Sequence, residues 1–402
     1  MNDPDQGPGR QVPPEQASGG FSIPVSVPGV LVIDVDALLR NYIKLRDLAA
    51  PAECAAVVKG DGYGLGARQI GAALFAAGCR TFFVATLAEG MALRGVLPDT
   101  VIYVLDGLFP GSAPEFVSAA LQPVLGSIDE IMEWAAFCRD RQARLPAAIH
   151  VDTGMNRLGL KAGDRRVLES RPNTLAGFPV SLLMSHLACA DTPEHPKNSA
   201  QQREFNAFAS LVPQTRLSLA NSAGVFLDAE FHFDLVRPGV ALYGGNPFSS
   251  RPNPMEPVIS LHGRIAQTGK AEAGETIGYG AGLQLKRATR YVTVSAGYAD
   301  GYFRLLGSSD AQAGALAYIG DHPLPILGRV SMDLIMFDVT DIPPELARRG
   351  GWVELIGPRF TVDNAAALAG TIGYEILTSL GRRYHRIYTR RTNETPQAGA
   401  SG

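Results

Sequence analysis

The chain has 402 residues, of which 46% are hydrophobic, and its formal net charge is −3. A chain of this length buries a large core and usually folds into two domains. Acidic and basic residues are spread along the whole sequence, and without a block of Lys and Arg we expect no nucleic-acid partner. No apolar run is long enough to span a membrane, so we expect no membrane association either.

Four scattered cysteines indicate a reducing, cytoplasmic environment. They are Cys54, Cys79, Cys138 and Cys189. None has CxxC spacing and each lies in apolar sequence, which is typical of reduced, buried thiols. The chain begins with a segment rich in Pro, Gly and Gln that lacks the apolar stretch of a signal peptide. We expect residues 1–27 and 392–402 to be disordered tails.

Short apolar runs predict the strands of the first domain. They are Ala55–Val58, Thr81–Ala85, Val101–Leu105, Pro123–Leu125, Ala147–Val151, Val180–Met184, Leu217–Leu219 and Leu235–Val236. Helical patterns accompany them; Leu38, Tyr42 and Leu45 recur at i, i+4 and i+7 after Asp36, the expected N-cap. About eight such units predict an α/β fold with an N-terminal (β/α)8 TIM-type barrel over residues 28–255. A doubly wound sheet remains the alternative, because periodicity does not show whether a sheet closes.

The sequence changes character after Pro238 and predicts a second, mostly β domain over residues 256–391. Pro and Gly become more frequent, and turn residues separate short β-like runs. These runs are Val258–Ile265, Tyr291–Ser295, Leu324–Leu327, Leu334–Val339 and Trp352–Leu355.

Polar residues follow the predicted barrel strands. They are Lys59, His150, Asp152, Arg157, His186, Asn221, Ser222 and Arg237. A (β/α)8 barrel carries its chemistry at the C-terminal ends of its strands, so we expect these side chains to share one site.

Lys59 is the first candidate catalytic residue. Burial at the end of a strand lowers the pKa of a lysine and frees its amine for Schiff-base formation. A lysine that extends into solvent is the alternative. The glycine-rich segment Gly60–Gly66 follows, and it lets backbone approach a ligand closely. It matches neither GxGxxG nor the Walker pattern, so neither a dinucleotide nor a nucleoside triphosphate is indicated.

Ser222 and the segment Arg237–Val240 follow predicted strands seven and eight, where barrels commonly bind phosphate. A Schiff-base lysine together with a phosphate site indicates a pyridoxal-phosphate enzyme. The alternative for Ser222 is a helix cap, and for Arg237 it is a structural cap of its strand.

These motifs resemble those of the alanine racemases, a family of fold-type III pyridoxal-phosphate enzymes. The similar segments are Ala56–Lys59 with Tyr63-Gly64, Val151–Gly159, Ser185–Ala188, Asn221–Ala223, Val236–Gly244, Gly278–Gly280, Gly297–Tyr302, Gly328–Asp333 and Gly373–Glu375. They occur in family order from about Leu31 to Tyr388. The resemblance implies a cytoplasmic homodimer with shared active sites that interconverts L- and D-alanine and supplies D-alanine for peptidoglycan.

The resemblance also implies two catalytic bases, Lys59 and the partner subunit's Tyr279. Inversion needs bases on opposite faces, because a proton leaves one face and arrives on the other. A phenol with a pKa of about 10 is a poor base alone. In the family a histidine, here His186, lies close to this tyrosine and to an arginine.

Further binding roles follow from the same resemblance. The implied cofactor-binding residues are Lys59, Tyr63, Arg157, His186, Asn221, Ser222, Arg237, Gly239, Val240 and Tyr374. The implied substrate-binding residues are Arg157, Met332, Asp333 and Tyr298, and no metal is implied. Arg237 would face the pyridine nitrogen and keep it unprotonated, which weakens the electron sink. Tyr298 and Tyr374 would crowd the substrate side chain and favour alanine-sized substrates.

Four residues depart from the pattern of many relatives: Leu65, Asn156, Ser331 and His150. His150 stands where many relatives carry a carbamylated lysine, so the way in which Arg157 is positioned stays open. Neutral imidazole can accept one hydrogen bond from Arg157 and form no ion pair. We expect activity that is independent of carbon dioxide and that falls as pH drops through the titration of His150.

Three other functions remain open from the residues alone. A fold-related decarboxylase of basic amino acids would need a cysteine in the second domain, and none follows Cys189. A non-catalytic, single-barrel cofactor-binding protein would have no use for a second domain with Tyr279. A metal-dependent barrel hydrolase would need a ligand set, but Cys189, Asp191 and His195 near His186 match no standard spacing.

Overall fold

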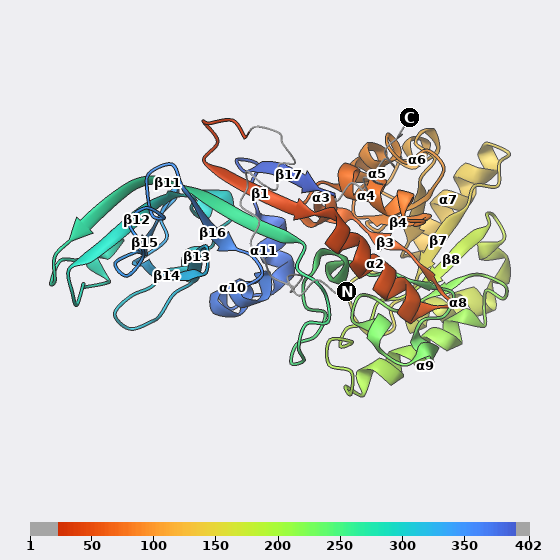
Figure 1. Cartoon of the computed structure of the whole chain (residues 1–402). Helices are drawn as coiled ribbons and strands as arrows, with labels where there is room; N and C mark the ends of the chain where they lie inside the picture. The colour runs from red at the N-terminus through yellow and green to blue at the C-terminus, as the bar shows by residue number, and fades with distance from the viewer. Residues whose placement is uncertain (1–22, 391–402) are drawn as a thin grey trace, which may run out of the picture. The chain divides into compact units, whose positions relative to one another are not determined.

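The computed structural model describes residues 23–390. The predicted tail 392–402 and almost all of the predicted tail 1–27 therefore lie outside the described residues. The chain divides into two compact units, one of residues 39–256 and one that combines the residues before Leu39 with those from Pro257 onward (Figure 1). Within the described part, no helix has the length and apolar character of a membrane span.

The first unit is built on parallel strands. A seven-stranded sheet follows chain order: β3 (Ala56–Val57), β4 (Thr81–Val84), β5 (Val101–Val104), β6 (Gln122–Leu125), β7 (Ala147–His150), β8 (Val180–Met184) and β9 (Leu217–Ser218). An eighth position is filled by β10 (Leu235–Val236), which pairs in parallel with β2 (Glu53–Cys54).

Backbone hydrogen bonds close these strands into a barrel. The N–H of Asp234 donates to the carbonyl of Leu217 and joins β10 to β9. The N–H of Ala55 donates to the carbonyl of Val236 and joins β10 to the first strand. The predicted (β/α)8 barrel is therefore confirmed, and the doubly wound sheet is excluded because the eighth strand returns to the first.

Helices cover the outside of the barrel (Figure 1). They are α4 (Ala67–Ala76), α5 (Leu87–Arg94), α6 (Ala113–Ser118), α7 (Ile128–Asp140), α8 (Ala162–Ser170) and α9 (Lys197–Ala209). Shorter elements of this unit are α3 (Lys59–Tyr63) and the 3-10 turns η1 (Pro172–Leu175), η2 (Gly224–Phe226), η3 (Ala229–Phe231) and η4 (Val240–Tyr243). The strands are buried on both faces, as in β4, where every residue is buried.

Helix α2 (Val35–Ala49) has the expected amphipathic pattern, and Leu38, Tyr42 and Leu45 are all buried. The expected N-cap was wrong. The helix begins at Val35, and the carboxylate of Asp34 accepts the N–H of Ala37 at 2.8 Å. Asp34 therefore caps the helix, and Asp36 lies within its first turn.

The second unit contains an eight-stranded sheet in the order β12-β15-β14-β13-β16-β11-β1-β17. Its strands are β1 (Gly29–Asp34), β11 (Ile259–Ala271), β12 (Thr289–Ser295), β13 (Leu316–Ile319), β14 (His322–Leu327), β15 (Leu334–Asp338), β16 (Trp352–Ile356) and β17 (His385–Thr389). A further pairing of β12 with β11 closes six of them into a mostly antiparallel barrel. The other elements are α10 (Val362–Ala369), α11 (Gly373–Ser379), η5 (Tyr279–Ala281), η6 (Tyr298–Asp300) and η7 (Arg304–Leu306).

Strand β1 changes the expected division of the chain. We expected the barrel to begin at residue 28, but β1 pairs antiparallel with β11 and parallel with β17. The first strand of the chain thus belongs to the second unit, and the barrel unit begins at Leu39. Since β10 already pairs with β2, the (β/α)8 barrel has no strand position left for β1.

Candidate active site

Lys59 lies at the start of a left-handed turn that follows β3. Gly60, Asp61, Gly62 and Tyr63 all have positive φ, between 52° and 64°. Glycine adopts this conformation without steric cost, which explains the glycine-rich sequence after Lys59. The carboxylate of Glu89 accepts the N–H of Gly60 at 2.7 Å and ties the turn to α5.

The environment of Lys59 favours a neutral amine. Burial lowers the pKa of Lys59, and the nearby guanidinium of Arg157 lowers it further. The carboxylates of Asp106 and Glu89 act in the opposite direction but do not outweigh these effects. A lysine with a lowered pKa is suited to Schiff-base formation and to proton transfer.

The loop after β10 comes close to Tyr63. A Cβ on Gly239 would overlap the Tyr63 hydroxyl, so only glycine fits there. The Tyr63 ring stacks on Tyr243, with ring centroids 4.6 Å apart. Tyr63 and Gly239, predicted from different motifs, thus lie side by side.

Ser222 binds the same loop through its hydroxyl oxygen, which accepts the N–H of Gly239 at 2.8 Å and the N–H of Ala241 at 3.3 Å. Ser222 therefore caps the backbone N–H groups at the start of η4, which is the structural alternative considered for it in the sequence. A hydroxyl that accepts two bonds still has its proton to donate, so Ser222 can also bind a phosphate oxygen.

Arg237 is a buried cation, only 4% exposed. Burial lowers its pKa to about 9, which still leaves it charged at neutral pH. Within the described residues its hydrogen bonds go to the Ser218 hydroxyl and to the Ser185 carbonyl, and no carboxylate pairs with it. A guanidinium has five N–H donors, so donors remain for a bound acceptor.

His186 and Asn221 lie beside each other after β8 and β9. The amide nitrogen of Asn221 is 3.5 Å from Nε2 of His186 and 3.3 Å from the Leu187 carbonyl. Burial first, and the cations Arg237 and Arg157 next, hold the pKa of His186 well below its usual range. His186 is therefore neutral at physiological pH.

The strand end after β7 holds His150, Asp152 and Arg157. Burial opposes ionisation of Asp152, but N–H groups of the next turn and the ammonium of Lys161 outweigh it, so the pKa of Asp152 is lowered. Asn156 adopts a φ of 57° in this turn. Arg157 is exposed, and in the described part of the chain no hydrogen bond or ion pair fixes it. The hydrogen bond to His150 that imidazole could accept is not formed here.

These strand ends concentrate positive charge. His186 lies within electrostatic reach of Lys59, His150, Arg157 and Arg237. Such a group repels protons and cations and attracts anions. The residues therefore fit pyridoxal phosphate, which carries a phosphate and a phenolate. The expected grouping of these side chains at the C-terminal strand ends is what the structure shows.

The remaining predicted site residues lie in the second unit, and most are exposed. Tyr279, in η5, is 69% exposed, and Met332 is 53% exposed. The N–H of Tyr298 donates to the Ser331 carbonyl at 3.1 Å, so η6 lies against the segment that carries Met332 and Asp333. Tyr374 is in the first turn of α11.

Several residues that hold these groups could not be singled out beforehand. Ser218 and Ser185 orient Arg237, and Gln201 holds the His186 backbone by donating to its carbonyl at 2.9 Å. The guanidinium of Arg329 lies beside Gly280, next to Tyr279. Only Ser185 and Arg329 lie in recognised motifs, and serine or glutamine elsewhere carries no distinctive signal.

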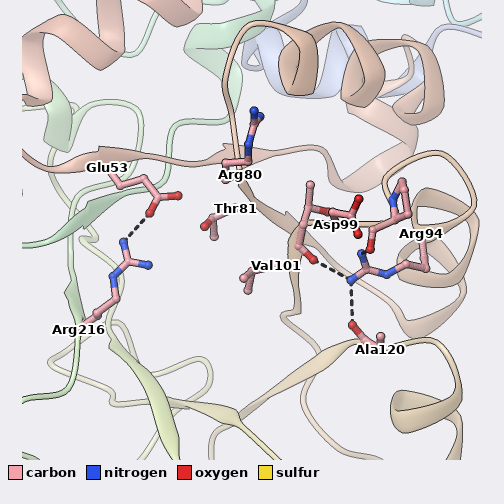
Figure 2. A pocket seen from close by; sticks show the side chains of 10 residues that line it. Glu53, Arg80, Thr81, Arg94, Asp99, Val101, Ala120 and Arg216 are labelled. Atoms are coloured by element: carbon pink, nitrogen blue, oxygen red, sulfur yellow. Dashed lines mark hydrogen bonds and ion pairs between the residues drawn. The ribbon is translucent and has the colours of Figure 1, made fainter.

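A cavity of about 440 Å³ lies at the opposite end of the barrel, where β4 and β5 begin (Figure 2). Its arginines have partners within the protein. Arg216 pairs with Glu53 at 2.6 Å, and Arg94 donates to backbone carbonyls such as those of Thr100 and Ala120. The N-terminal end of a (β/α)8 barrel contributes to stability, whereas active sites lie at the C-terminal end, so we do not place the active site there.

No group of three His, Cys, Asp or Glu side chains among residues 23–390 is arranged to hold a metal ion. Near the segment that offered a metal alternative, Nδ1 of His195 accepts the N–H of Lys197 at 3.1 Å. His195 thus has a local structural role.

The fold and the grouping of side chains define a two-domain barrel enzyme with a lysine at the end of its first barrel strand. Residues 33–247 match the family model for the alanine racemase N-terminal domain, and residues 258–388 match that for the C-terminal domain. An alanine racemase of Methylobacterium sp. (strain 4-46) is 50% identical, over 89% of this chain and 97% of the relative. A catabolic alanine racemase of Mesorhizobium japonicum is 48% identical, over 89% of this chain and 93% of the relative.

Among solved structures, alanine racemase from Bartonella henselae with covalently bound pyridoxal phosphate is 39% identical and has a TM-score of 0.85. The similarity covers 90% of this chain and 99% of that one. The chain therefore belongs to the alanine racemase family of isomerases, which confirms the resemblance drawn from its motifs.

Proposed function

We propose that the protein is a pyridoxal-phosphate-dependent racemase that interconverts L- and D-alanine. The observation that carries the proposal is Lys59, an amine with a lowered pKa at the end of a barrel strand. Lys59 and the buried guanidinium of Arg237 both lie within electrostatic reach of the neutral His186. The covalently bound cofactor of the Bartonella relative supports the same assignment.

The barrel residues would hold the cofactor at both ends. Lys59 would bind it covalently, and Tyr63, Ser222 and the backbone of Gly239 and Val240 would bind its phosphate. When bound, pyridoxal phosphate supplies a ring that accepts the electrons of the broken Cα–H bond.

The remaining barrel contacts tune and orient that ring. Arg237 would donate to the pyridine nitrogen, and because its own proton is held at neutral pH, that nitrogen stays unprotonated. Asn221 and His186 would line the ring, and Arg157 would lie beside its phenolate and the substrate carboxylate.

Two bases would move the Cα proton. Lys59 would act on one face through Nζ, since its lowered pKa makes the neutral amine accessible. Tyr279 of the partner subunit would act on the other face through its hydroxyl. In its own chain Tyr279 is largely exposed, which supports a role at a surface that a second copy covers. We therefore propose a homodimer with shared active sites.

The second unit would supply the substrate contacts. Met332, Asp333 and Tyr298 would line the approach, and Tyr374 would contact the cofactor phosphate and limit the space for the substrate side chain. Alanine is the substrate that fits these contacts. The D-alanine produced would be used in peptidoglycan synthesis. We propose a cytoplasmic location, which the unpaired thiols of Cys54, Cys79 and Cys138 support.

The proposed function is tested by measuring the formation of D-alanine and by locating the bound cofactor on the chain. Purified protein incubated with L-alanine should form D-alanine, measured by chiral chromatography, and it should be yellow. Borohydride reduction followed by peptide mapping should place the cofactor on Lys59. A cofactor adduct on Lys270 or Lys286, or no D-alanine, would contradict the proposal. Rescue of a D-alanine-requiring bacterium would support the role in peptidoglycan.

A further inference from the structure

Asp300 joins three segments of the second unit. It is 6% exposed, and its Oδ2 accepts the N–H of Gly297 at 3.0 Å, which closes the η6 turn that carries Tyr298. Its carbonyl accepts the N–H of Gly381 at 2.9 Å, just after helix α11. Its Oδ1 accepts Nε of Arg383 at 2.5 Å.

Arg383 extends this connection to a further segment. Its Nη1 donates to Asp333 at 2.8 Å, while its Nε holds Asp300. The backbones of the two aspartate segments are also in contact, because the N–H of Ala299 donates to the Met332 carbonyl at 3.0 Å. One guanidinium therefore bridges the turn that carries Tyr298 and the segment that carries Met332.

The geometry of this bridge matters more than its energy. Arg383 and Asp333 are both about half exposed, at 51% and 55% of their side-chain surface. Exposed ion pairs contribute little to stability. The planar guanidinium, however, fixes two acceptors at a set separation, which a lysine cannot do. Without it, the carboxylates of Asp300 and Asp333 would lose the cation that they share, and their like charges would repel.

We propose that Arg383 is a positioning residue that holds the Tyr298 turn and the Met332-Asp333 segment at the separation that the substrate needs. The inference rests on the proposed function, which assigns substrate contacts to Tyr298, Met332 and Asp333. Arg383 touches no substrate itself and acts through these two segments.

The test compares Arg383→Met with a matched control. Arg287 in the same unit also contacts two aspartates, Asp341 at 2.6 Å and Asp338 at 3.4 Å, but neither adjoins a predicted site residue. In Arg383→Met we expect the KM for alanine to rise about ten- to a hundredfold while kcat stays within about threefold, as misplaced substrate contacts require. Arg287→Met should keep the wild-type KM. The unfolding temperatures and the cofactor absorption spectra of the two variants should agree.

Two further variants separate positioning from folding. Arg383→Lys keeps the positive charge but loses the planar guanidinium that binds two carboxylates at once. Its KM should therefore lie between those of wild type and Arg383→Met. Adding Asp300→Asn to Arg383→Met removes the repulsion without changing a proposed substrate contact, so the raised KM should return part of the way to the wild-type value. If Arg383→Met folds poorly, Arg383→Lys decides, and a wild-type KM in it overturns the inference.

The outcomes distinguish this inference from the function on which it rests. Wild-type protein that makes no D-alanine would overturn both. Active wild-type protein together with equal KM values in Arg383→Met and Arg287→Met would overturn the positioning role alone. A loss of kcat without a change in KM would do the same.

Discussion

By the resemblance drawn from the motifs, His150 stands at a position where a carbamylated lysine is expected, and its surroundings favour a neutral histidine there. Burial, reinforced by the cations Arg237 and Arg157, lowers the pKa of His150 to about 4. A protonated imidazole would add one more cation to an already positive site. From the sequence we expected His150 to titrate with an ordinary histidine pKa. In the structure, the pKa of His150 lies well below neutral pH.

This shift predicts how activity depends on pH and on bicarbonate. Because the folded-state pKa of His150 is depressed, the residue stays neutral as pH falls through 6.5 and takes up a proton only near pH 4. Between about pH 5 and 8, kcat/KM of wild type and of His150→Asn should therefore follow profiles of the same shape. Added bicarbonate should change neither protein, since imidazole forms no stable carbamate.

Two results would contradict this prediction. One is a limb of the wild-type profile near pH 6.5 that His150→Asn lacks, which would mean that His150 titrates normally. The other is a wild-type activity that increases with bicarbonate, which would mean that another residue carries the carbamate.

In the loop from β10 to η4, the close approach of Tyr63 limits which residue can occupy position 239. A Cβ on Gly239 would overlap the Tyr63 hydroxyl, so a larger residue at this position requires Tyr63 to move. Gly239→Ala should displace Tyr63 and weaken the binding of pyridoxal phosphate by about tenfold or more, through misplaced contacts rather than unfolding.

A matched control for this variant is Gly95→Ala in the C-terminal cap of α5. Gly95 has a φ of −60°, and a Cβ there would have its nearest contact at 3.5 Å, an ordinary separation. Titration of the two apo-proteins with pyridoxal phosphate, followed by absorbance, gives the dissociation constants. Equal constants would show that the contact between Gly239 and Tyr63 does not shape the cofactor site.

The elements also show how far the sequence could predict the fold. Barrel strands such as β7 were recognisable as apolar runs between helical patterns, since both faces of a parallel strand are buried. Strand β1 was not assignable, because the apolar run Val30–Ile33 does not reveal that its partner is β11. Pairing between segments more than 200 residues apart is set by tertiary packing, which no local pattern encodes.

The candidate site divides in the same way. Lys59, His186 and Arg237 were predictable, because strand ends of a barrel meet at one face and their motifs are recognisable. The pairing of Arg383 with Asp300 was not, because the two residues are 83 positions apart and Arg383 lies outside every recognised motif. Their connection depends on the contact between η6 and the segment after α11, which only the folded chain shows.

At the scale of the whole molecule, the account requires two chains in each active site, because the two proposed bases lie in different units and Tyr279 is exposed in its own chain. Lys59→Ala and Tyr279→Phe should each be nearly inactive as homodimers. Mixing them under conditions of subunit exchange should restore up to about a quarter of the wild-type sites, since a hybrid dimer holds one intact site. Mass spectrometry verifies that exchange takes place. Proven exchange without recovered activity would exclude the shared arrangement.

The central claim is that Lys59 and Tyr279 serve opposite faces of the substrate. It is tested most directly by single-turnover deuterium wash-in from solvent with Tyr279→Phe and each alanine enantiomer. Loss of the phenol should slow Cα–H exchange of L-alanine by about a hundredfold or more and leave that of D-alanine close to wild type, because Lys59 still serves its own face. Equal slowing of both enantiomers would contradict the two-base account and leave Tyr279 a structural residue.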